Sequence, residues 1–273
     1  MERSKVSLSH EKETLLIPLY GKAMARKAGI SFFEDPKAEE IVAHIDYDFQ
    51  SLKIAPKTNL LMCLRAKLLD NYIREFLRQP GEKGVLHLGC GLDSRYGRIG
   101  DPSADWYDVD FEEVIDIRRH FYPETDRYHL IPSSVTEDEW VSHIPQYHSC
   151  YLVVAEGLFM YLQENEIATL LRRLKARVGE FTLIFDAFST LTARRVKDHP
   201  SLKETGAKVY WGIDDAGSLS NLVEGVRFIK EIAFSANEEV PKLGWGMRLG
   251  FKLAHLFPMA RKAHGILLYE VRR

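Results

Sequence analysis

The sequence predicts an α/β protein whose centre is a Rossmann-like, mostly parallel sheet of seven strands. Between residues 84 and 187, short apolar runs alternate with amphipathic stretches, which is the pattern of β-α-β units. Two of these runs, 151–155 and 181–185, are apolar almost throughout, as expected of strands covered on both faces. Two more strands, 227–234 and 264–271, follow a long interruption and complete the sheet, with a helix near 247–257 between them.

The first eighty residues are predicted to be helical and to form a lid over one edge of the sheet. From the spacing of apolar residues, helices are expected at 15–28, 37–45 and 57–78. Pro18 is expected to interrupt the first helix, and Asp35-Pro36 is a start signal for the second. Pro80-Gly81 ends the third helix, just before the sheet begins.

The middle of the chain is expected to alternate five strands with three helices. The strands are predicted at 84–88, 105–110, 127–131, 149–155 and 181–187, and the helices at 111–121, 136–143 and 163–178. The sequence therefore predicts one domain over residues 1–273. Its parts are a helical cap (1–80), a cofactor-binding core (84–187), an insertion that forms a substrate lid (188–225) and C-terminal strands (226–273).

Composition excludes several classes of function. The chain has 273 residues and a net charge of −2, without the basic stripe that a nucleic-acid partner requires. No apolar run approaches the roughly 18 residues of a membrane span, and the polar N-terminus does not resemble a signal peptide. Cys63, Cys90 and Cys150 are widely spaced, with no C-x-x-C motif, which indicates a reducing cytoplasm and no metal site.

A glycine turn after the first sheet strand indicates a cofactor site. Gly89 and Gly91 follow the apolar strand 84–88, and glycines at such a turn let a ligand approach the backbone closely. Asp110 closes the next strand, about 20 residues further on, where a carboxylate can bind both hydroxyls of a ribose. The segment therefore predicts a cofactor that contains adenosine.

Two kinds of adenosine cofactor are compatible with such a turn. A nicotinamide dinucleotide would need a third glycine in G-x-G-x-x-G, to bring its pyrophosphate to a helix N-terminus, and here that position is Ser94. S-adenosylmethionine has no phosphate and does not need the third glycine. We therefore favour S-adenosylmethionine, with an NAD-dependent oxidoreductase as the nearest alternative enzyme.

Polar residues from several segments are expected to meet at the carboxyl edge of the sheet, where open α/β sheets bind ligands. These residues are Gly89, Asp110, Ser134, Glu156 and Asp186. A carboxylate at Glu156 can accept hydrogen bonds from an ammonium group. Arg65, on the third helix, can pair with a carboxylate through two hydrogen bonds, although periodicity alone also allows a surface salt bridge there.

The chain resembles the leucine carboxyl methyltransferase superfamily, in particular its bacterial branch of tetracenomycin-type polyketide O-methyltransferases. The resemblance runs in order over about residues 11–235. It is carried by 13–23 (ETLLIPLYGKA), Asp35-Pro36, Arg65-x-x-x-x-Asp70, 88–93 (LGCGLD), 109–114 (VDFEEV) and 155–162 (AEGLFMYL). It implies the sheet of class I methyltransferases, in which the last strand runs antiparallel, and S-adenosylmethionine as the cofactor.

The resemblance also implies roles for individual residues. Arg65 and, near the N-terminus, Lys22 would bind the methionine carboxylate, and the Gly89 backbone and Glu156 would bind its ammonium group. Asp110 would bind the ribose, and Ser134 and Val135 would contact adenine. Leucine carboxyl methyltransferases have an aspartate where this chain has Ser134, so the adenine amino group is expected to be held differently or more weakly here.

The implied activity is transfer of a methyl group to an oxygen of a small molecule, either a carboxylate or a phenol. A carboxylate is already ionised at pH 7, whereas a phenol, with a pKa of about 10, needs a neighbouring base or cation. Tyr161 and Trp211 are expected to line the acceptor pocket, and other candidates near it are Arg194, Arg195, His199 and Tyr210. A rival of another class is a non-catalytic sensor that binds the cofactor but has lost turnover.

Overall fold

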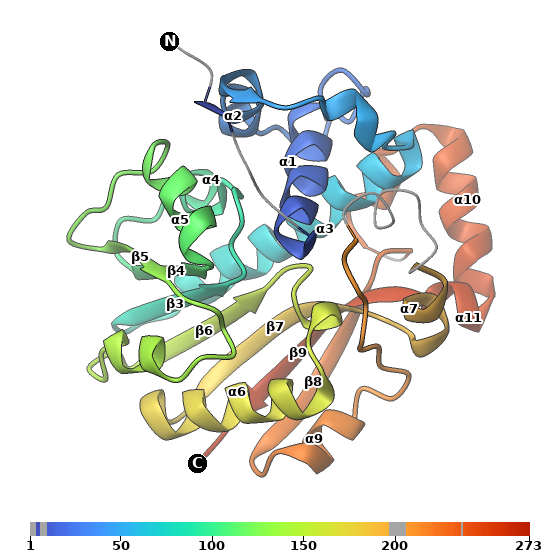
Figure 1. Ribbon diagram of the computed structural model, residues 1–273. Coiled ribbons are helices and arrows are strands. Elements are labelled where there is room, and N and C mark those ends of the chain that lie inside the picture. Colours follow the sequence, from blue (N-terminus) through green and yellow to red (C-terminus); the bar gives the residue numbers. More distant parts are fainter. Residues whose placement is uncertain (1–3, 6–9, 197–205, 236) are drawn as a thin grey trace.

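The computed structural model describes residues 4–5, 10–196, 206–235 and 237–273, and a twisted sheet of seven strands lies at its centre (Figure 1). The strands are β3 (Lys83–Leu88), β4 (Asp105–Asp110), β5 (Tyr128–Pro132), β6 (Cys150–Ala155), β7 (Phe181–Phe188), β8 (Val226–Ala233) and β9 (His264–Val271). They lie in the order β5-β4-β3-β6-β7-β9-β8. The pairs from β5 to β7 are parallel, and β9 is antiparallel to both its neighbours. The predicted sheet, including its antiparallel last strand, is confirmed.

The strand predictions agree with the structure to within one residue at each end. β3 is buried along its whole length, because helices cover both faces of the sheet. Successive side chains of a strand point to opposite faces, so Val85 packs against the N-terminal helices and Leu86 packs against the opposite layer. This double coverage explains why strands in the middle of the sheet have nearly continuous apolar sequences.

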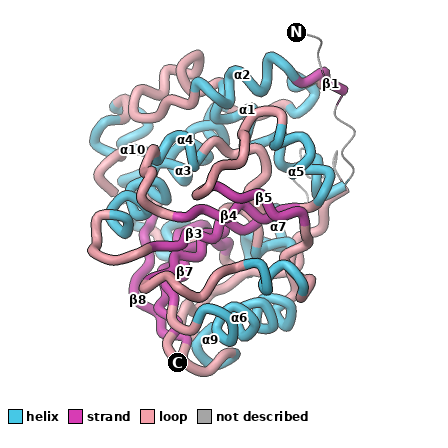
Figure 2. Tube along the Cα trace, turned by 90° about the vertical axis from the view of Figure 1, so that its left-hand side faces the viewer, coloured by secondary structure: helices cyan, strands magenta, loops and turns pink. Residues whose placement is uncertain are grey.

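Two layers of helices enclose the sheet (Figure 2). One layer holds α1 (Leu16–Ala23), α2 (Pro36–His44), α3 (Pro56–Leu77), α4 (Arg95–Ile99) and α5 (Glu112–Arg119). The other holds the 3-10 helix η3 (Glu139–His143), α6 (Glu164–Val178) and α9 (Ser218–Leu222). The other helices in the described part of the chain are α7 (Thr190–Val196), α10 (Trp245–Leu256), α11 (Pro258–Arg261) and the 3-10 helices η4 (Phe159–Tyr161) and η5 (Val240–Lys242). None of the helices that the structure describes combines the length and apolarity needed to cross a membrane.

The N-terminal cap contains short elements before and between its three α-helices. These elements are β1 (Ser4–Lys5), which pairs with β2 (Ile45–Asp46), and the 3-10 helices η1 (His10–Leu15) and η2 (Phe49–Leu52). The prediction that Pro18 interrupts the first helix is wrong. Pro18 is the third residue of α1, and the N–H groups of the first turn have no intrahelical partner in any case. Asp35 caps α2, as predicted, by accepting a hydrogen bond of 3.0 Å from Ala38 N.

The predicted helix at 136–143 is also wrong, because only the 3-10 helix η3 forms there. Ile144 precedes Pro145 and has an extended backbone, with φ −76° and ψ 123°. Steric contact with the proline ring disfavours helical geometry at the residue before it, so η3 ends at His143. Trp140 and Val141 are nevertheless buried, which accounts for the helix-like pattern of the sequence.

Candidate functional site

A pocket of about 1000 Å³ lies at the carboxyl ends of the strands, between the sheet and the N-terminal helices. Eight of the nine residues predicted for the cofactor or acceptor line this pocket. They are Lys22, Arg65, Gly89, Asp110, Ser134, Val135, Glu156 and Tyr161. The ninth, Trp211, is not part of the pocket wall. Segments that are distant in the sequence thus converge on one cavity, at the edge of the sheet where ligands bind in α/β proteins.

The glycine turn between β3 and α4 forms the floor of the pocket. Gly89 has φ +61° and Gly91 φ +52°, a left-handed conformation that residues with a Cβ rarely adopt. A Cβ on Gly89 would also lie 2.9 Å from Cδ1 of Leu158. The N–H of Gly89 donates to the carbonyl of Val109 (2.8 Å), so its own carbonyl is the backbone group that it can offer to a ligand.

Asp110, the last residue of β4, is held by the glycine turn. Its Oδ2 accepts from Gly91 N at 2.7 Å, and its Oδ1 accepts from Phe111 N at 2.8 Å. Burial raises the pKa of Asp110 to about 6, which these two hydrogen bonds only partly oppose. A carboxylate at this position has unused lone pairs that face the pocket and can accept from two neighbouring hydroxyl groups.

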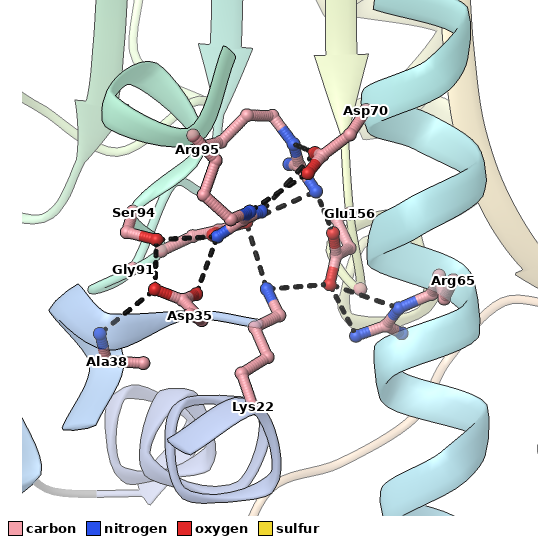
Figure 3. A network of polar contacts seen from close by, with 12 residues as sticks. Lys22, Asp35, Ala38, Arg65, Asp70, Gly91, Ser94, Arg95 and Glu156 are labelled. Atoms are coloured by element: carbon pink, nitrogen blue, oxygen red, sulfur yellow. Dashed lines mark hydrogen bonds and ion pairs between the residues drawn. The ribbon is translucent and has the colours of Figure 1, made fainter. Parts of the chain in front are cut away.

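Glu156, immediately after β6, is surrounded by cations (Figure 3). Its Oε1 lies 3.2 Å from Nζ of Lys22 and 3.1 Å from Nη2 of Arg65, and its Oε2 accepts from Arg95. Burial alone would raise the pKa of Glu156, but Lys22, Arg95 and Arg65 hold it well below its usual value. Two cations and a carboxylate therefore face one end of the pocket.

Arg65 does not form the surface salt bridge that periodicity allowed, because it is buried and shared between two carboxylates. Besides Glu156, its Nη1 lies 2.9 Å from Oδ2 of Asp186. Asp186 was expected at the carboxyl end of the strand 181–187, and it lies near the end of β7, where it is fully buried. It also accepts from Gly157 N at 2.6 Å and contacts Nε2 of His264 at 2.7 Å.

The same charges continue into a buried ion cluster that joins the cap to the core (Figure 3). We use this name for Lys22, Asp35, Arg65, Asp70, Asp93, Arg95, Arg98, Glu156 and Asp186. Asp35 Oδ1 accepts from Ser94 Oγ at 2.6 Å, and Asp35 Oδ2 lies 2.7 Å from Nη1 of Arg98. Arg98 and Arg95 both reach Asp70 on α3, each at 2.9 Å.

The predicted adenine contacts lie in a turn after β5. The hydroxyl of Ser134 lies 2.8 Å from that of Thr136 and also accepts from Thr136 N at 3.3 Å. The side chain of Ser134 is thus held by its own turn. Val135 is buried beside it and supplies an apolar contact at the same end of the pocket.

Only some of the residues predicted to lie near the acceptor line the pocket. Tyr161 lines the pocket, and burial raises its pKa. Trp211 was predicted to line the pocket too, but it packs in the core with Phe159 and Phe185, where an indole buries the most apolar area. Its neighbour Tyr210 lines the pocket instead. Arg194 and Arg195 are exposed outside the pocket wall, and His199 lies outside the described residues.

Sequence reasoning missed two histidines of the pocket wall. His87 lies within β3, with Nδ1 3.0 Å from Asp108 and Nε2 2.9 Å from Nη1 of Arg95. His264 is the first residue of β9 and contacts Asp186. The available signal was a histidine inside or beside an otherwise apolar strand, where burial requires specific hydrogen-bond partners.

Comparison with known sequences gives concordant results. The family model for leucine carboxyl methyltransferase matches residues 5–175. A tetracenomycin polyketide synthesis O-methyltransferase of Streptomyces glaucescens is 36% identical over 272 residues, covering 97% of this chain and 98% of that protein. An S-adenosyl-L-methionine-dependent methyltransferase of Gibberella zeae is 29% identical, covering 93% of this chain and 92% of that protein.

Solved structures share the architecture at low sequence identity. A duf574 family protein of Streptomyces avermitilis superposes with a TM-score of 0.59 at 9% identity, over 93% of this chain and 97% of that one. An S-adenosylmethionine-dependent methyltransferase of Anabaena variabilis gives a TM-score of 0.51 at 13% identity, over 76% of this chain and 84% of that one. At these identities, the similarity concerns the fold alone.

Proposed function

We propose that this chain, which belongs to the leucine carboxyl methyltransferase family, methylates a carboxylate or phenolic oxygen of a small aromatic molecule. It is an S-adenosylmethionine-dependent methyltransferase. When bound, this cofactor supplies a methyl group on a sulfonium, which an oxygen nucleophile can attack in line. One observation carries the proposal for the acceptor: the charged end of the pocket continues directly into an apolar wall, so both reactants have room in one cavity.

For the charged end, we propose that Lys22 and Arg65 hold the cofactor carboxylate. Glu156 and the carbonyl of Gly89 would hold its ammonium group. The support is chemical complementarity, because an amino acid tail carries one negative and one positive charge, and the pocket presents two cations beside one carboxylate. These side chains already form ion pairs with one another, so binding of the cofactor would exchange ion pairs rather than desolvate free charges.

For the nucleoside, we propose that Asp110 accepts from the two ribose hydroxyls and that Val135 packs against adenine. The hydroxyl of Ser134 is hydrogen-bonded to Thr136, so Ser134 would shape the turn beside adenine rather than bind adenine through its hydroxyl. Only a carboxylate can accept from both hydroxyls while also accepting from the backbone of Gly91 and Phe111. In this proposal the core supplies the contacts with the nucleoside, whereas the cap supplies Lys22 and Arg65 for the amino acid tail.

The acceptor would lie against the apolar part of the pocket wall. This part includes Ile17, Pro18, Leu61, Met62, Met160, Tyr161, Phe188 and Tyr210. Apolar and aromatic side chains with a few polar groups are typical of small-molecule sites, and aromatic rings suit a flat substrate. A relative named for polyketide synthesis supports the same class of acceptor. Cys63, Cys90 and Cys150 are free thiols, which is compatible with the cytoplasmic location that we propose.

In this protein, catalysis would rest largely on positioning. A dry site that aligns an oxygen nucleophile with a methyl group removes most of the entropic cost of bringing the two together. The buried ion cluster fixes the charged end of the pocket, so that the apolar wall determines how the acceptor is oriented. A sensor that only binds the cofactor would not need the apolar part of this pocket.

The test is calorimetric titration of the purified protein with S-adenosylhomocysteine, with NAD as the control, followed by turnover assays. We expect S-adenosylhomocysteine to bind and NAD not to bind. Aromatic carboxylic acids and phenols should then yield methyl esters or ethers, which mass spectrometry identifies. Binding of S-adenosylhomocysteine without turnover on any oxygen acceptor would contradict the proposal and favour the sensor. Binding of NAD alone would contradict the assignment of the cofactor site.

A further inference from the structure

The helices α10 and α11 carry many exposed apolar side chains at the edge of the molecule (Figure 1). No residue of α10 is buried, and Trp245 and Leu256 are 80% and 72% exposed. Among the described residues, seven of the eleven large hydrophobic side chains that are exposed lie between residues 245 and 259. They are Trp245, Met247, Leu249, Leu253, Leu256, Phe257 and Met259. An apolar patch concentrated on one segment in this way marks a site of interaction.

One apolar face of α10 points away from the protein. We call it the apolar stripe, and its residues, spaced by four, four and three positions, are Trp245, Leu249, Leu253 and Leu256. Phe251 lies on the opposite face of the helix, where it packs against a buried cluster that includes Leu60 of α3. Nδ1 of His255 lies 3.1 Å from Oγ of Ser235 and also attaches this side of α10 to the body of the protein. The apolar stripe therefore faces outward.

Exposed cations accompany the apolar stripe. Arg248 and Lys252 are four residues apart on one flank of the stripe. Arg261 ends α11, and Lys262 follows it. No aspartate or glutamate occurs between residues 240 and 269. Within the described part of the chain, none of these four cations forms an ion pair. This surface therefore combines apolar area with positive charge that no acidic side chain neutralises.

We propose that α10 and α11 form a docking surface for membranes that contain anionic phospholipids. The helix α10 lies in the plane of the membrane, its apolar stripe enters the boundary between headgroups and acyl chains, and the cations pair with lipid phosphates. Trp245 suits this boundary, because an indole is apolar and carries one polar N–H. Such a helix does not need to span the membrane. The inference goes beyond the proposed function and does not depend on which acceptor is methylated.

Docking at this surface brings the pocket close to the membrane. The helix α11 ends at Arg261, and three residues further His264 begins β9 and lines the pocket. The helix α11 also packs against β9. The residues of α10 and α11 are not part of the pocket wall, so the protein can bind lipid and cofactor at the same time.

The charge of this surface favours lipid over a second copy of the chain. In a symmetric dimer the same patch lies on both sides of the interface, so the cations of the two copies would face one another. Another protein would need a surface shaped to fit α10, which has no buried residue and projects from the body of the protein. A lipid surface adapts to such a helix, and anionic headgroups complement its charge.

The test measures binding of the full chain to phosphatidylcholine vesicles with and without phosphatidylglycerol. We expect the protein to sediment with the vesicles that contain phosphatidylglycerol, to bind pure phosphatidylcholine much more weakly, and to dissociate as the salt concentration rises. Tryptophan fluorescence is a second readout, because Trp106, Trp140 and Trp211 are buried and only Trp245 is exposed. A shift of the emission to shorter wavelength on addition of vesicles therefore reports the transfer of Trp245 into lipid.

A double variant, Leu249→Glu with Leu253→Glu, tests the apolar stripe. Two carboxylates on this face should abolish binding to vesicles, because they are repelled by anionic headgroups and costly to bury in lipid. Both leucines are exposed, so the free energy of unfolding should not change. The matched control is Ile229→Glu, which places the same charge at another exposed apolar position, on β8, and should bind vesicles like the unmodified protein.

A second double variant, Arg248→Gln with Lys252→Gln, tests the cations and leaves the apolar stripe intact. Each charge removed should weaken binding to vesicles with phosphatidylglycerol about fivefold. Arg119→Gln with Arg172→Gln changes the net charge of the chain by the same amount at exposed positions of α5 and α6, and it should leave binding unchanged. All variants should still bind S-adenosylhomocysteine, because none of the altered residues lines the pocket.

Failure to bind vesicles that contain phosphatidylglycerol, or binding that survives both double variants, would overturn the inference. If the unmodified protein did not bind vesicles and sedimented in the ultracentrifuge as a dimer that Leu249→Glu with Leu253→Glu dissociates, a second copy would cover this face instead. Retention of an acidic protein without binding to vesicles would likewise replace lipid with a protein partner. None of these results would affect the proposed function, which titration with S-adenosylhomocysteine and turnover assays test separately.

Discussion

Asp35 Oδ1 accepts a hydrogen bond of 2.6 Å from Oγ of Ser94, and this contact connects the start of α2 to the start of α4. Ser94 occupies the position at which a dinucleotide-binding turn has its third glycine. There the structure places the carboxylate of Asp35, together with Asp93, whose carboxylate pairs with Arg98 at 2.6 Å. A pyrophosphate at this turn would have to compete with these two carboxylates for Arg98, which disfavours a dinucleotide here.

The first prediction concerns the stability that Asp35 provides. In Asp35→Asn the amide can still cap α2, but the carboxylate that faces Arg98 is lost. We expect the free energy of unfolding to fall by about 1–3 kcal/mol, the contribution of a hydrogen bond to a charged group. Asp35→Ala should lose about 1 kcal/mol more, because the cap is lost as well.

Urea unfolding followed by circular dichroism measures both changes. The matched control is Asp48→Asn, because Asp48 caps the exposed start of η2 by accepting a hydrogen bond of 3.1 Å from Gln50 N, and among the described residues it forms no ion pair. An equal effect of Asp35→Asn and Asp48→Asn would show that the buried charge of Asp35 contributes nothing.

The second prediction concerns the pH dependence of cofactor binding. Burial raises the pKa of Asp110 to about 6, so the free protein carries a protonated Asp110 below that pH. A protonated carboxyl cannot accept from both ribose hydroxyls. The affinity for S-adenosylhomocysteine should therefore rise as pH increases through about 6, and it should fall by up to about tenfold per pH unit below it.

The raised pKa of Asp110 affects the stability of the free protein in the opposite sense: affinity for the cofactor rises with pH, whereas stability falls. Because the pKa of Asp110 lies above its unfolded value of 3.8, its favourable contribution to folding exists in full below pH 3.8 and is lost as pH rises through about 6. Calorimetry between about pH 5 and pH 8 tests the binding prediction, with Asp110→Asn as the control. A pH profile that is the same for both proteins would contradict the role of Asp110.

The third prediction concerns Arg65, for which alanine is an ambiguous test because it would leave Glu156 and Asp186 buried without this cation. Arg65→Lys keeps the charge but cannot present two parallel N–H groups to a carboxylate. We expect the affinity for S-adenosylhomocysteine to fall by about 1.5–3 kcal/mol and the affinity for adenosine to stay unchanged.

Titration with both ligands separates the two effects, because adenosine lacks the amino acid tail. Lys67→Arg, two residues further along α3 and outside the pocket wall, is the control and should change neither affinity. If Arg65→Lys weakened adenosine as much as S-adenosylhomocysteine, Arg65 would not contact the tail.

The fourth prediction distinguishes two neighbouring aromatic residues. Trp211 is 7% exposed and packs against Phe159 and Phe185, so Trp211→Leu should lower the free energy of unfolding by roughly 2–4 kcal/mol. Tyr210 is 58% exposed and lines the pocket, so Tyr210→Ala should raise KM for the acceptor without destabilising the protein. Thermal unfolding together with steady-state kinetics tests both. A large change of KM with Trp211→Leu at full folding would contradict the assignment.

The sequence was sufficient to predict the sheet, because burial on both faces of β6 and β7 requires nearly continuous apolar runs. Prediction failed where a single local contact decides the conformation. Pro145 ends η3 at His143, and Pro18 is tolerated because it lies in the first turn of α1.

The candidate site was only partly predictable for a different reason. Asp110 and Glu156 follow apolar strands, so their positions in the sequence place them at the edge of the sheet. The roles of Arg95 and His264 depend on contacts with Glu156 and Asp186, which are 61 and 78 residues away in the sequence. The spacing of residues in a sequence does not reveal a buried ion pair. In the sequence, a charged residue of such a pair cannot be distinguished from a charged residue on the surface.

The buried ion cluster restricts which sequence changes the cap and the core can accept independently of each other. Lys22, Asp35, Arg65 and Asp70 come from the cap, and each has a charged partner in the core. A chimera that exchanged residues 1–80 with those of a distant homologue would inherit half of each pair, and every mismatch would leave a buried charge uncompensated. The cap and the glycine turn therefore have to be inherited together. Substrate specificity can therefore vary through residues of the apolar wall, such as Tyr210 and Met160, which do not depend on a charged partner.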